Sequence, residues 1–319
     1  MSEAGGLPQT KPKNISLNWT RRKIGRVIKN QSLVLGAAII TIVLIFAFIL
    51  PAFVTTNPLG QNLPNRLRPP VWLAKAMPEH PLGTDQLGRD ILSRLMMGTR
   101  VSLGIGVGGV LLSAVFGVMM GMASGYFGGR IDTAIQRVVE LQMAFPFIII
   151  ALIVMAFLRA TPGRLMIVFG FTGWVIYARI IRGVTLSVRQ RQFVEAAVGT
   201  GGSPLYIIRR HVLPNIINTA IVLATLELSV LIYAEAAISF LGIGIQPPTP
   251  SLGVMLGEGR VYLSNAWWLA TLPGLVLMFL ILGVNFLGDG LREALDPNLA
   301  GSSSNTRFIL PINKEAKYG

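Results

Sequence analysis

Two glutamates lie within one long apolar stretch of this sequence, where an ionisable side chain is unexpected. Glu227 and Glu235 stand eight positions apart, which places them on roughly the same face of a helix. Carboxyl groups in such surroundings are costly, and they are retained for function or for pairing with another polar group. Two interpretations stay open. The glutamates line a translocation path and meet a substrate's amino terminus, or they pair with a partner subunit or with Arg on another helix.

A short polar segment, residues 193–215, interrupts the apolar sequence just before these glutamates. Phe193–Val198 predicts a short helix, with Glu195 early enough to interact favourably with the positive end of the helix dipole. The glycines that follow permit a sharp turn, because glycine adopts left-handed backbone conformations readily. They are Gly199, Gly201 and Gly202.

A second helix is expected directly after this turn. Ser203 is a suitable N-cap and Pro204 suits the first helical position, so the helix would run through Leu205–Val212. Pro214 and Asn215 would then break or kink the lead into the next apolar stretch. The segment is either a compact helix–turn–helix projection or an ordinary basic loop.

A second polar segment, HPLGTDQLGRDILSRL at His80–Leu95, precedes another apolar stretch. Thr84 or Asp85 is a candidate cap for a helix lying at the membrane surface. Asp90 and Arg94 stand four apart and are expected to pair on that helix. The aspartates do not form the EF-hand pattern, so calcium is not predicted here.

Several chemistries are excluded by missing motifs. The chain has no Cys, no Walker A phosphate loop, no HExxH and no G-x-S-x-G nucleophile elbow. Its two histidines, His80 and His211, are far apart in sequence, which makes a zinc cluster implausible. We therefore predict no catalysis, no metal site and no cofactor bound by this chain. If ATP drives the protein, another subunit must bind ATP and Mg²⁺.

The composition places the chain among membrane proteins. Of its 319 residues, 52% are hydrophobic and only 13% are charged, with a mean hydropathy of +0.61. A soluble domain needs far more charge on its surface. The formal net charge of +14 is explained better by basic loops facing anionic lipid than by nucleic acid.

Charge-poor stretches of about 20 residues predict transmembrane helices. Pro146 and Pro273 lie within such stretches and are expected to mark kinks. The predicted fold class is an all-α integral membrane protein with about six transmembrane helices. The expected spans are 33–54, 101–129, 141–158, 165–181, 217–241 and 266–288.

The distribution of Lys and Arg predicts the orientation. Six spans put both termini on one side, and a cytoplasmic N-terminus puts most of the 28 Lys and Arg residues inside. The predicted segments are a cytoplasmic basic tail 1–31, a first transmembrane helix 32–54, a periplasmic loop 55–100 with an interfacial helix, a five-helix transmembrane core 101–288 that includes the cytoplasmic loop 193–215, and a cytoplasmic C-terminal tail 289–319.

Small residues recur at helix spacing in the second span. Gly117, Gly121 and Gly125 repeat every four residues, which lets a neighbouring helix approach closely. GIGVGG at Gly104–Gly109 loosely resembles a dinucleotide fingerprint, but it lies within a span and no strand precedes it. Close helix packing is the predicted role of these glycines.

The polar segment resembles a known motif. The spacing of Glu195–Ala196–Ala197, Gly201 and Leu213–Pro214 is similar to the EAA loop of membrane subunits of ATP-binding cassette (ABC) importers. His211 stands where the family usually has Ile, although the peptide-importer branch often reads RHVLPN, as here. A second EAA at Glu235–Ala237 lacks the glycine spacing and lies inside an apolar stretch.

Other motifs extend the resemblance to roughly residues 20–300. His80–Leu95, GIGIQPPTPSLGVML at Gly242–Leu256 and GDGLREALDP at Gly288–Pro297 are similar to the second permease subunit of dipeptide and oligopeptide ABC importers, the DppC/OppC type. The resemblance implies a type I ABC importer permease fold in the bacterial inner membrane. It implies import of di- or oligopeptides, with nickel chelates, glutathione or oligosaccharides as alternatives within the subgroup.

The resemblance also implies partners and roles. The expected partners are a homologous DppB/OppB-type permease, two ATP-binding subunits of the DppD/DppF type, an extracytoplasmic substrate-binding protein and membrane lipid. The residues expected to couple to the ATPase are Glu195, Ala196, Ala197, Gly201, Arg209, Arg210, His211, Leu213 and Pro214. The residues expected at the receptor-docking surface are Asp85, Arg89, Asp90, Gln246, Pro247 and Pro248.

A competing class is an ATP-independent channel or secondary transporter. That class predicts an internal sequence repeat across the two halves, and no clear repeat is present. The EAA spacing also has no role in such a protein.

Overall fold

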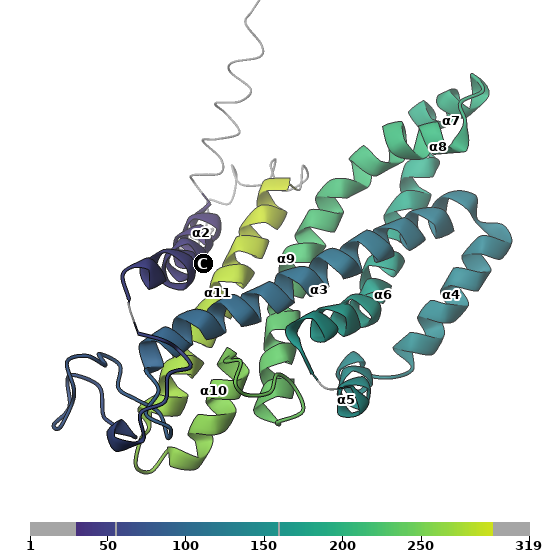
Figure 1. The fold of residues 1–319 in the computed structure, drawn as a ribbon. Helices are drawn as coiled ribbons and strands as arrows, with labels where there is room; N and C mark the ends of the chain where they lie inside the picture. Colours follow the sequence, from purple (N-terminus) through teal and green to yellow (C-terminus); the bar gives the residue numbers. More distant parts are fainter. Residues whose placement is uncertain (1–29, 55, 159, 296–319) are drawn as a thin grey trace, which may run out of the picture.

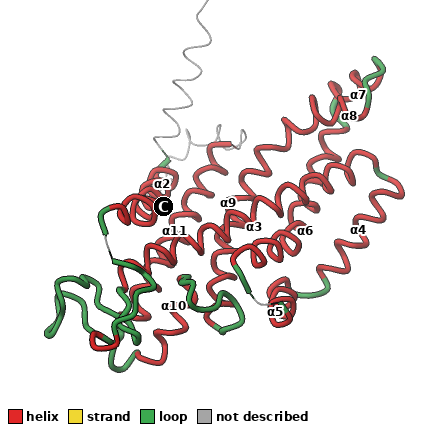
Figure 2. The backbone as a smooth tube through the Cα atoms, viewed as in Figure 1, coloured by secondary structure: helices red, strands yellow, loops and turns green. Residues whose placement is uncertain are grey.

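The computed structural model describes residues 30–54, 56–158 and 160–295. Every regular element among them is a helix, and the only β-type pairing is an isolated bridge between Thr84 and Asp90. Figure 2 shows this all-helical backbone with loops gathered mainly at one end. The α-helices among these residues are α2 (Gln31–Leu44), α3 (Ile91–Phe127), α4 (Gly129–Met143), α5 (Phe147–Phe157), α6 (Pro162–Arg189), α7 (Gln192–Gly199), α8 (Pro204–Ile207), α9 (Leu213–Phe240), α10 (Leu252–Gly259) and α11 (Trp268–Leu295).

The described residues contain five helices long and apolar enough to cross a membrane, or six if the bent pair α4 and α5 forms one span. The first of them, Gln31–Ala52, extends α2 through a π-turn at Ile45–Ile49 and a final turn of 3₁₀-helix. The predicted all-α membrane class is confirmed. Most of the predicted tail 1–31, and the part of the tail 289–319 beyond residue 295, lie outside the described residues.

The third predicted span is not continuous. α4 and α5 meet at an angle of 78°, and α5 has only 11 residues. Pro146 stands at the start of α5, where its missing N–H and fixed φ terminate the preceding helix rather than bend it gently. The expected span over 141–158 is therefore not one continuous helix, and the break falls at Pro146, where a kink was predicted.

The second span begins earlier than predicted. Residues 91–100 belong to the 37-residue helix α3 and do not form a separate helix on the membrane surface. Ile91, Leu95 and Met96 are at most 2% exposed, and Ile91 and Leu95 pack with buried residues of α10 and α11. Because this apolar face is covered by protein, it has no surface left for lipid, and the predicted interfacial helix is wrong.

The glycine stripe lies where α3 crosses α6. A Cβ atom placed on Gly121 would lie 2.7 Å from the carbonyl oxygen of Ala178, and one on Gly125 would lie 2.8 Å from that of Arg182. These backbones approach too closely for any side chain, which is the reason the positions are glycine. The predicted role in close helix packing is confirmed.

We expect Gly121→Ala to destabilise the folded chain by about 1–3 kcal/mol, because the added methyl group must push α3 away from α6. Gly104→Ala, in the same helix, is the matched control, since a Cβ atom at Gly104 meets nothing within 4 Å. Thermal unfolding of the two variants in detergent checks this. Equal midpoints for both variants would contradict the packing argument.

The two sides of the bundle carry different elements. The beginning of α2, the end of α11 and the segment holding α7 and α8 lie on one side, with α7 and α8 standing apart from the other two, and α10 with the loops before α3 lies on the opposite side (Figure 1). Asn30 fixes part of this arrangement, because its side chain caps α2 and donates to Glu293 of α11 at 2.7 Å. The bundle therefore has two distinct ends, each with its own polar surface.

Candidate functional site

Residues 192–212 form a helix–turn–helix unit beyond the bundle, called the projection below (Figure 1). α7 ends in a turn in which Gly201 has φ +82° and the N–H of Gly202 donates to the carbonyl of Ala197 at 3.0 Å. A Cβ atom on Gly202 would lie 2.7 Å from that same oxygen, so the turn requires glycine there. Ser203 caps α8 by accepting from the N–H of Tyr206, as predicted.

The projection continues directly into α9. A π-turn at Ile208–Val212 joins α8 to α9, so that Pro204–Phe240 forms one 37-residue helical element. Of the two outcomes predicted for Pro214, a break or a kink, the break does not occur, because the helix continues through a π-turn that ends just before this residue. A π-turn widens the backbone ring, which accommodates the proline ring and its missing N–H. Asn215 also stays helical, and its side chain donates to the carbonyl of His211 at 2.7 Å.

The projection is anchored on one side and exposed on the other. Val194, Ile207 and Val212 are buried and pack against the ends of α6 and α9. Glu195 and Ala196 are exposed. Within the described part of the chain, Glu195 forms no ion pair, so its charge is available to a partner.

Apolar side chains also stand exposed on the projection. Leu205 is 76% exposed, and Tyr206 and Val198 are each 55% exposed. Three such residues on one short unit are typical of a protein contact surface. Sequence reasoning missed them, although their signal was present as large apolar residues in a segment otherwise rich in glycine and charge.

A hollow of about 800 Å³ adjoins the projection on the α3 side. Glu195 and Arg189 supply opposite charges to its lining, and Tyr126 and Phe127 supply aromatic rings from the end of α3. The guanidinium of Arg189 lies 5.9 Å from the ring centroid of Tyr126, which fixes the basic side chain by a cation–π contact. The contact surface therefore includes the end of α3 as well as the projection.

Glu235 lies at the centre of a buried polar network. Its side chain is fully enclosed and accepts from Ser102 of α3 at 2.6 Å and from Ser239 at 2.8 Å. Ser102 in turn accepts from the N–H of Leu252 at the start of α10. Glu235 therefore connects α3, α9 and α10 through hydroxyl groups, and no Arg among the described residues pairs with it.

Glu227 lies closer to the middle of α9 and is 7% exposed. A Cβ atom on Gly173 of α6 would lie 3.2 Å from its Oε1, so α6 passes close to the carboxyl group. The neighbouring Tyr177 is fully buried, and its hydroxyl has no hydrogen-bond partner among the described residues. Both glutamates thus face helices of this same chain.

Charged residues at the opposite end of the bundle form an internal ion cluster of Asp85, Arg89, Arg94 and Glu258. Arg89 donates to Asp85 at 2.6 Å and to Glu258 at 3.1 Å. Arg94 reaches the same two carboxylates. Arg94 therefore pairs with Asp85 and not with Asp90, which corrects the predicted pair four residues apart.

Asp90 has another role. It caps α3 by accepting from the N–H of Ser93 at 2.8 Å, where Thr84 or Asp85 was predicted. Its other oxygen lies 3.0 Å from Nδ1 of His80. Asp85, Arg89 and Asp90 are at most 3% exposed, so they hold this end of the molecule together from within and are not themselves the predicted docking surface.

Comparison with known proteins places this geometry in a family. Residues 113–301, more than half of the chain, match the family of the binding-protein-dependent transport system inner membrane component. The chain belongs to that family. It is an ABC importer permease of the DppC/OppC type, and membership implies in general a partner permease, an ATPase and a binding protein.

Named relatives support this membership over most of their length. The permease is 38% identical over 271 residues to the dipeptide transport system permease protein DppC of Haemophilus influenzae, which covers 85% of this chain and 92% of the relative. It is 35% identical over 288 residues to DppC of Bacillus subtilis, covering 90% and 88%. It is 38% identical over 220 residues to the glutathione transport system permease protein GsiD of Pectobacterium atrosepticum, covering 69% and 73%.

The permease brings some predicted site residues together and separates others. Glu195, Ala196, Ala197 and Gly201 share the projection with Arg209 and Arg210, which are also exposed. Gln246, Pro247 and Pro248 are exposed far from it, at the end that holds the ion cluster. No group of His, Asp and Glu able to hold a metal ion occurs among the residues that the structure describes.

Proposed function

We propose that this permease subunit translocates di- or oligopeptides across the inner membrane, driven by ATP hydrolysis in partner subunits. The observation that carries the coupling is the continuity of α8, the π-turn and α9 in one helical element. A push on the projection is therefore applied directly to α9, without a flexible joint between them. Relatives named for dipeptide transport support the substrate class.

The exposed part of the projection supports docking on an ATPase. Glu195 carries an open negative charge, while Leu205 and Tyr206 supply apolar contact area. Two ATP-binding subunits of the DppD/DppF type bind ATP and Mg²⁺, and this chain binds neither. Arg209 and Arg210 add basic side chains beside the same surface, and His211 packs between Phe193 and Tyr206. Leu213 and Pro214 transmit the displacement into α9.

The opposite end of the bundle faces the substrate-binding protein in this proposal. The termini and the projection are then cytoplasmic, and the loop with the ion cluster is periplasmic. The exposed residues Gln246, Pro247 and Pro248 contribute contacts, while Asp85, Arg89 and Asp90 keep the surface in shape from inside. A DppB/OppB-type permease completes the translocation path.

The two transmembrane glutamates take different roles. Glu235 maintains the junction of α3, α9 and α10, since it is enclosed and bonded to serines. Glu227 has some exposure and is the better candidate for lining the path in another state of the transport cycle. Glutathione, itself a small peptide derivative, is the second candidate substrate, favoured by the similarity to GsiD.

Uptake in cells with and without this chain tests the substrate. We expect deletion to abolish uptake of labelled di- and oligopeptides, and complementation with the intact chain to restore it. Loss of glutathione uptake alone would select the second candidate. Peptide uptake that needs this chain yet persists after ATP depletion would contradict the ABC mechanism and favour a channel or secondary transporter.

A further inference from the structure

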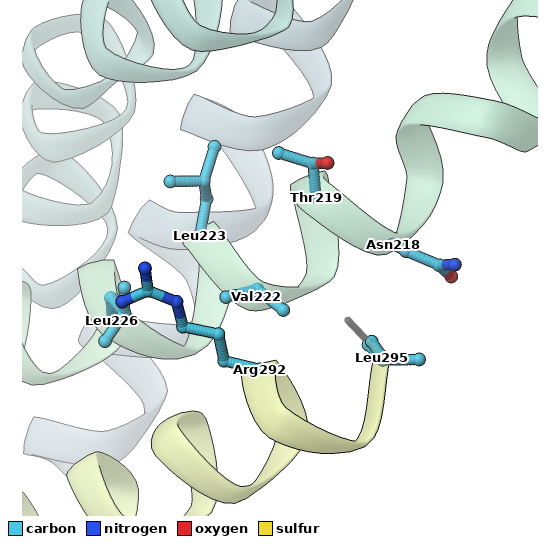
Figure 3. A pocket seen from close by; sticks show the side chains of 7 residues that line it. All are labelled: Asn218, Thr219, Val222, Leu223, Leu226, Arg292 and Leu295. Carbon is cyan, nitrogen blue, oxygen red and sulfur yellow. The ribbon is translucent and has the colours of Figure 1, made fainter. Parts of the chain in front are cut away.

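A pocket of about 470 Å³ lies between α9 and α11, at the end of the bundle that carries the projection. Figure 3 shows Arg292 reaching from α11 toward α9, with its guanidinium beside Leu226. Asn218 and Thr219 supply the other polar groups of the lining. The remaining lining residues are apolar, namely Val222, Leu223, Leu226 and Leu295.

Arg292 carries a positive charge that the described part of the chain does not neutralise. It is exposed and forms no ion pair there. The neighbouring carboxylate of Glu293 accepts a hydrogen bond from the side chain of Asn30 at 2.7 Å and does not pair with Arg292. A guanidinium at the side of an apolar pocket is suited to an anionic group that accepts two hydrogen bonds.

The pocket lies near the ends of two helices that are long and apolar enough to cross a membrane, Gln31–Ala52 and α11. Asn30, the N-cap of α2, contacts α11 one residue from Arg292, so the first span and the last reach a boundary together. Away from this boundary, the exposed face of α9 is apolar. Leu226, Val230 and Tyr233 are 37%, 41% and 61% exposed along it. A charged group at one end and an apolar track beyond it match the two parts of a phospholipid.

We propose that this pocket binds an anionic phospholipid, with Arg292 holding the phosphate and the exposed face of α9 receiving an acyl chain. Asn218 and Thr219 add polar groups to the pocket lining on the part of α9 nearer the projection. Such a lipid fills the angle between α9 and α11, so it acts on the same helix that continues from the projection. Basic pockets between transmembrane helices on the cytoplasmic side are known to recognise anionic headgroups in this way.

The test uses the full-length chain in its assembled transporter, purified in mild detergent and equilibrated with phosphatidylglycerol or phosphatidylcholine. Native mass spectrometry counts the retained lipid. We expect phosphatidylglycerol to be retained in preference to phosphatidylcholine. Arg292→Gln should lower that retention about tenfold, the loss of one charge-assisted contact. Arg137→Gln, which removes the same charge from an exposed site on α4, is the matched control and should change nothing.

A second variant tests the same pocket without removing Arg292, so that a folding defect of Arg292→Gln cannot account for both results. Asn218→Asp keeps Arg292 but places a negative charge in the pocket, and it should also reduce phosphatidylglycerol retention. Unchanged retention in both variants would overturn the proposal. Displacement of the lipid by a free-carboxylate peptide, but not by its C-terminal amide, would overturn it too, because the pocket would then belong to the substrate path.

Discussion

Replacing Glu195 by Lys is expected to reduce ATP-driven uptake to below about a tenth of the wild-type rate while the chain still folds and enters the membrane. Reversal of a contact charge commonly costs more than the 1.4 kcal/mol that corresponds to a tenfold loss. Glu195 is exposed and forms no ion pair within the described residues, so the fold does not depend on it. Its interaction with the α7 dipole contributes only about 0.3–1 kcal/mol.

Three measurements check this result together. Uptake, ATPase activity of the assembled transporter and the amount of protein in the membrane should be measured for the same cells. Glu140→Lys is the matched control, because Glu140 is an exposed carboxylate on α4 and not on the projection. Normal uptake by the Glu195→Lys protein would refute the coupling role, and loss of membrane protein would show that Glu195 has a structural role instead.

Replacing Asp85 by Ala is expected to destabilise the chain by about 3–5 kcal/mol, the usual effect of leaving a buried charge without its partner. Asp85 accepts from both Arg89 and Arg94, whose side chains are at most 3% exposed. Its second oxygen also accepts from the N–H groups of Leu87 and Arg89, at 2.8 and 2.9 Å. After the change, Glu258 alone would face two buried guanidinium groups.

Thermal unfolding of the purified permease measures the effect. The matched control breaks an exposed ion pair, Arg137–Glu140 on α4, through Glu140→Ala, and exposed pairs of this kind contribute little. We expect a large fall in the unfolding midpoint for Asp85→Ala and almost none for the control. Equal midpoints would contradict this result and mean that water solvates the two guanidinium groups once Asp85 is removed.

Local chemistry made several parts of this protein predictable. Ser203 and Pro204 favour a helix start at their own position, because the serine hydroxyl accepts from a backbone N–H of the first turn and the fixed φ of proline suits the first helical residue. Gly117, Gly121 and Gly125 likewise predicted a close helix contact from their spacing, although not which helix would fill it. The EAA spacing located the projection, since the motif and the turn that displays it occupy the same few residues.

Contacts between distant residues were not predictable in this way. Arg94 pairs with Asp85 and not with Asp90 because a loop brings Asp85 back against the first turns of α3. Its second partner, Glu258, lies 164 positions further along the chain. The same is true of Glu235, whose partner Ser102 lies 133 positions away. Spacing along one helix cannot reveal such partners.

The sequence by itself determined the membrane class, most of the spans and the residues of the projection, because hydropathy, caps and turns depend on neighbours within a few positions. Only the tertiary structure decided that α3 begins at Ile91, that α4 and α5 bend by 78°, and that α8 continues into α9. The start of α3 depends on which surfaces other helices cover, whereas Pro146 marks where α4 and α5 separate and only the angle between them comes from the tertiary structure. A buried face can extend a helix past its polar start, and an internal partner can make a charged residue part of the core.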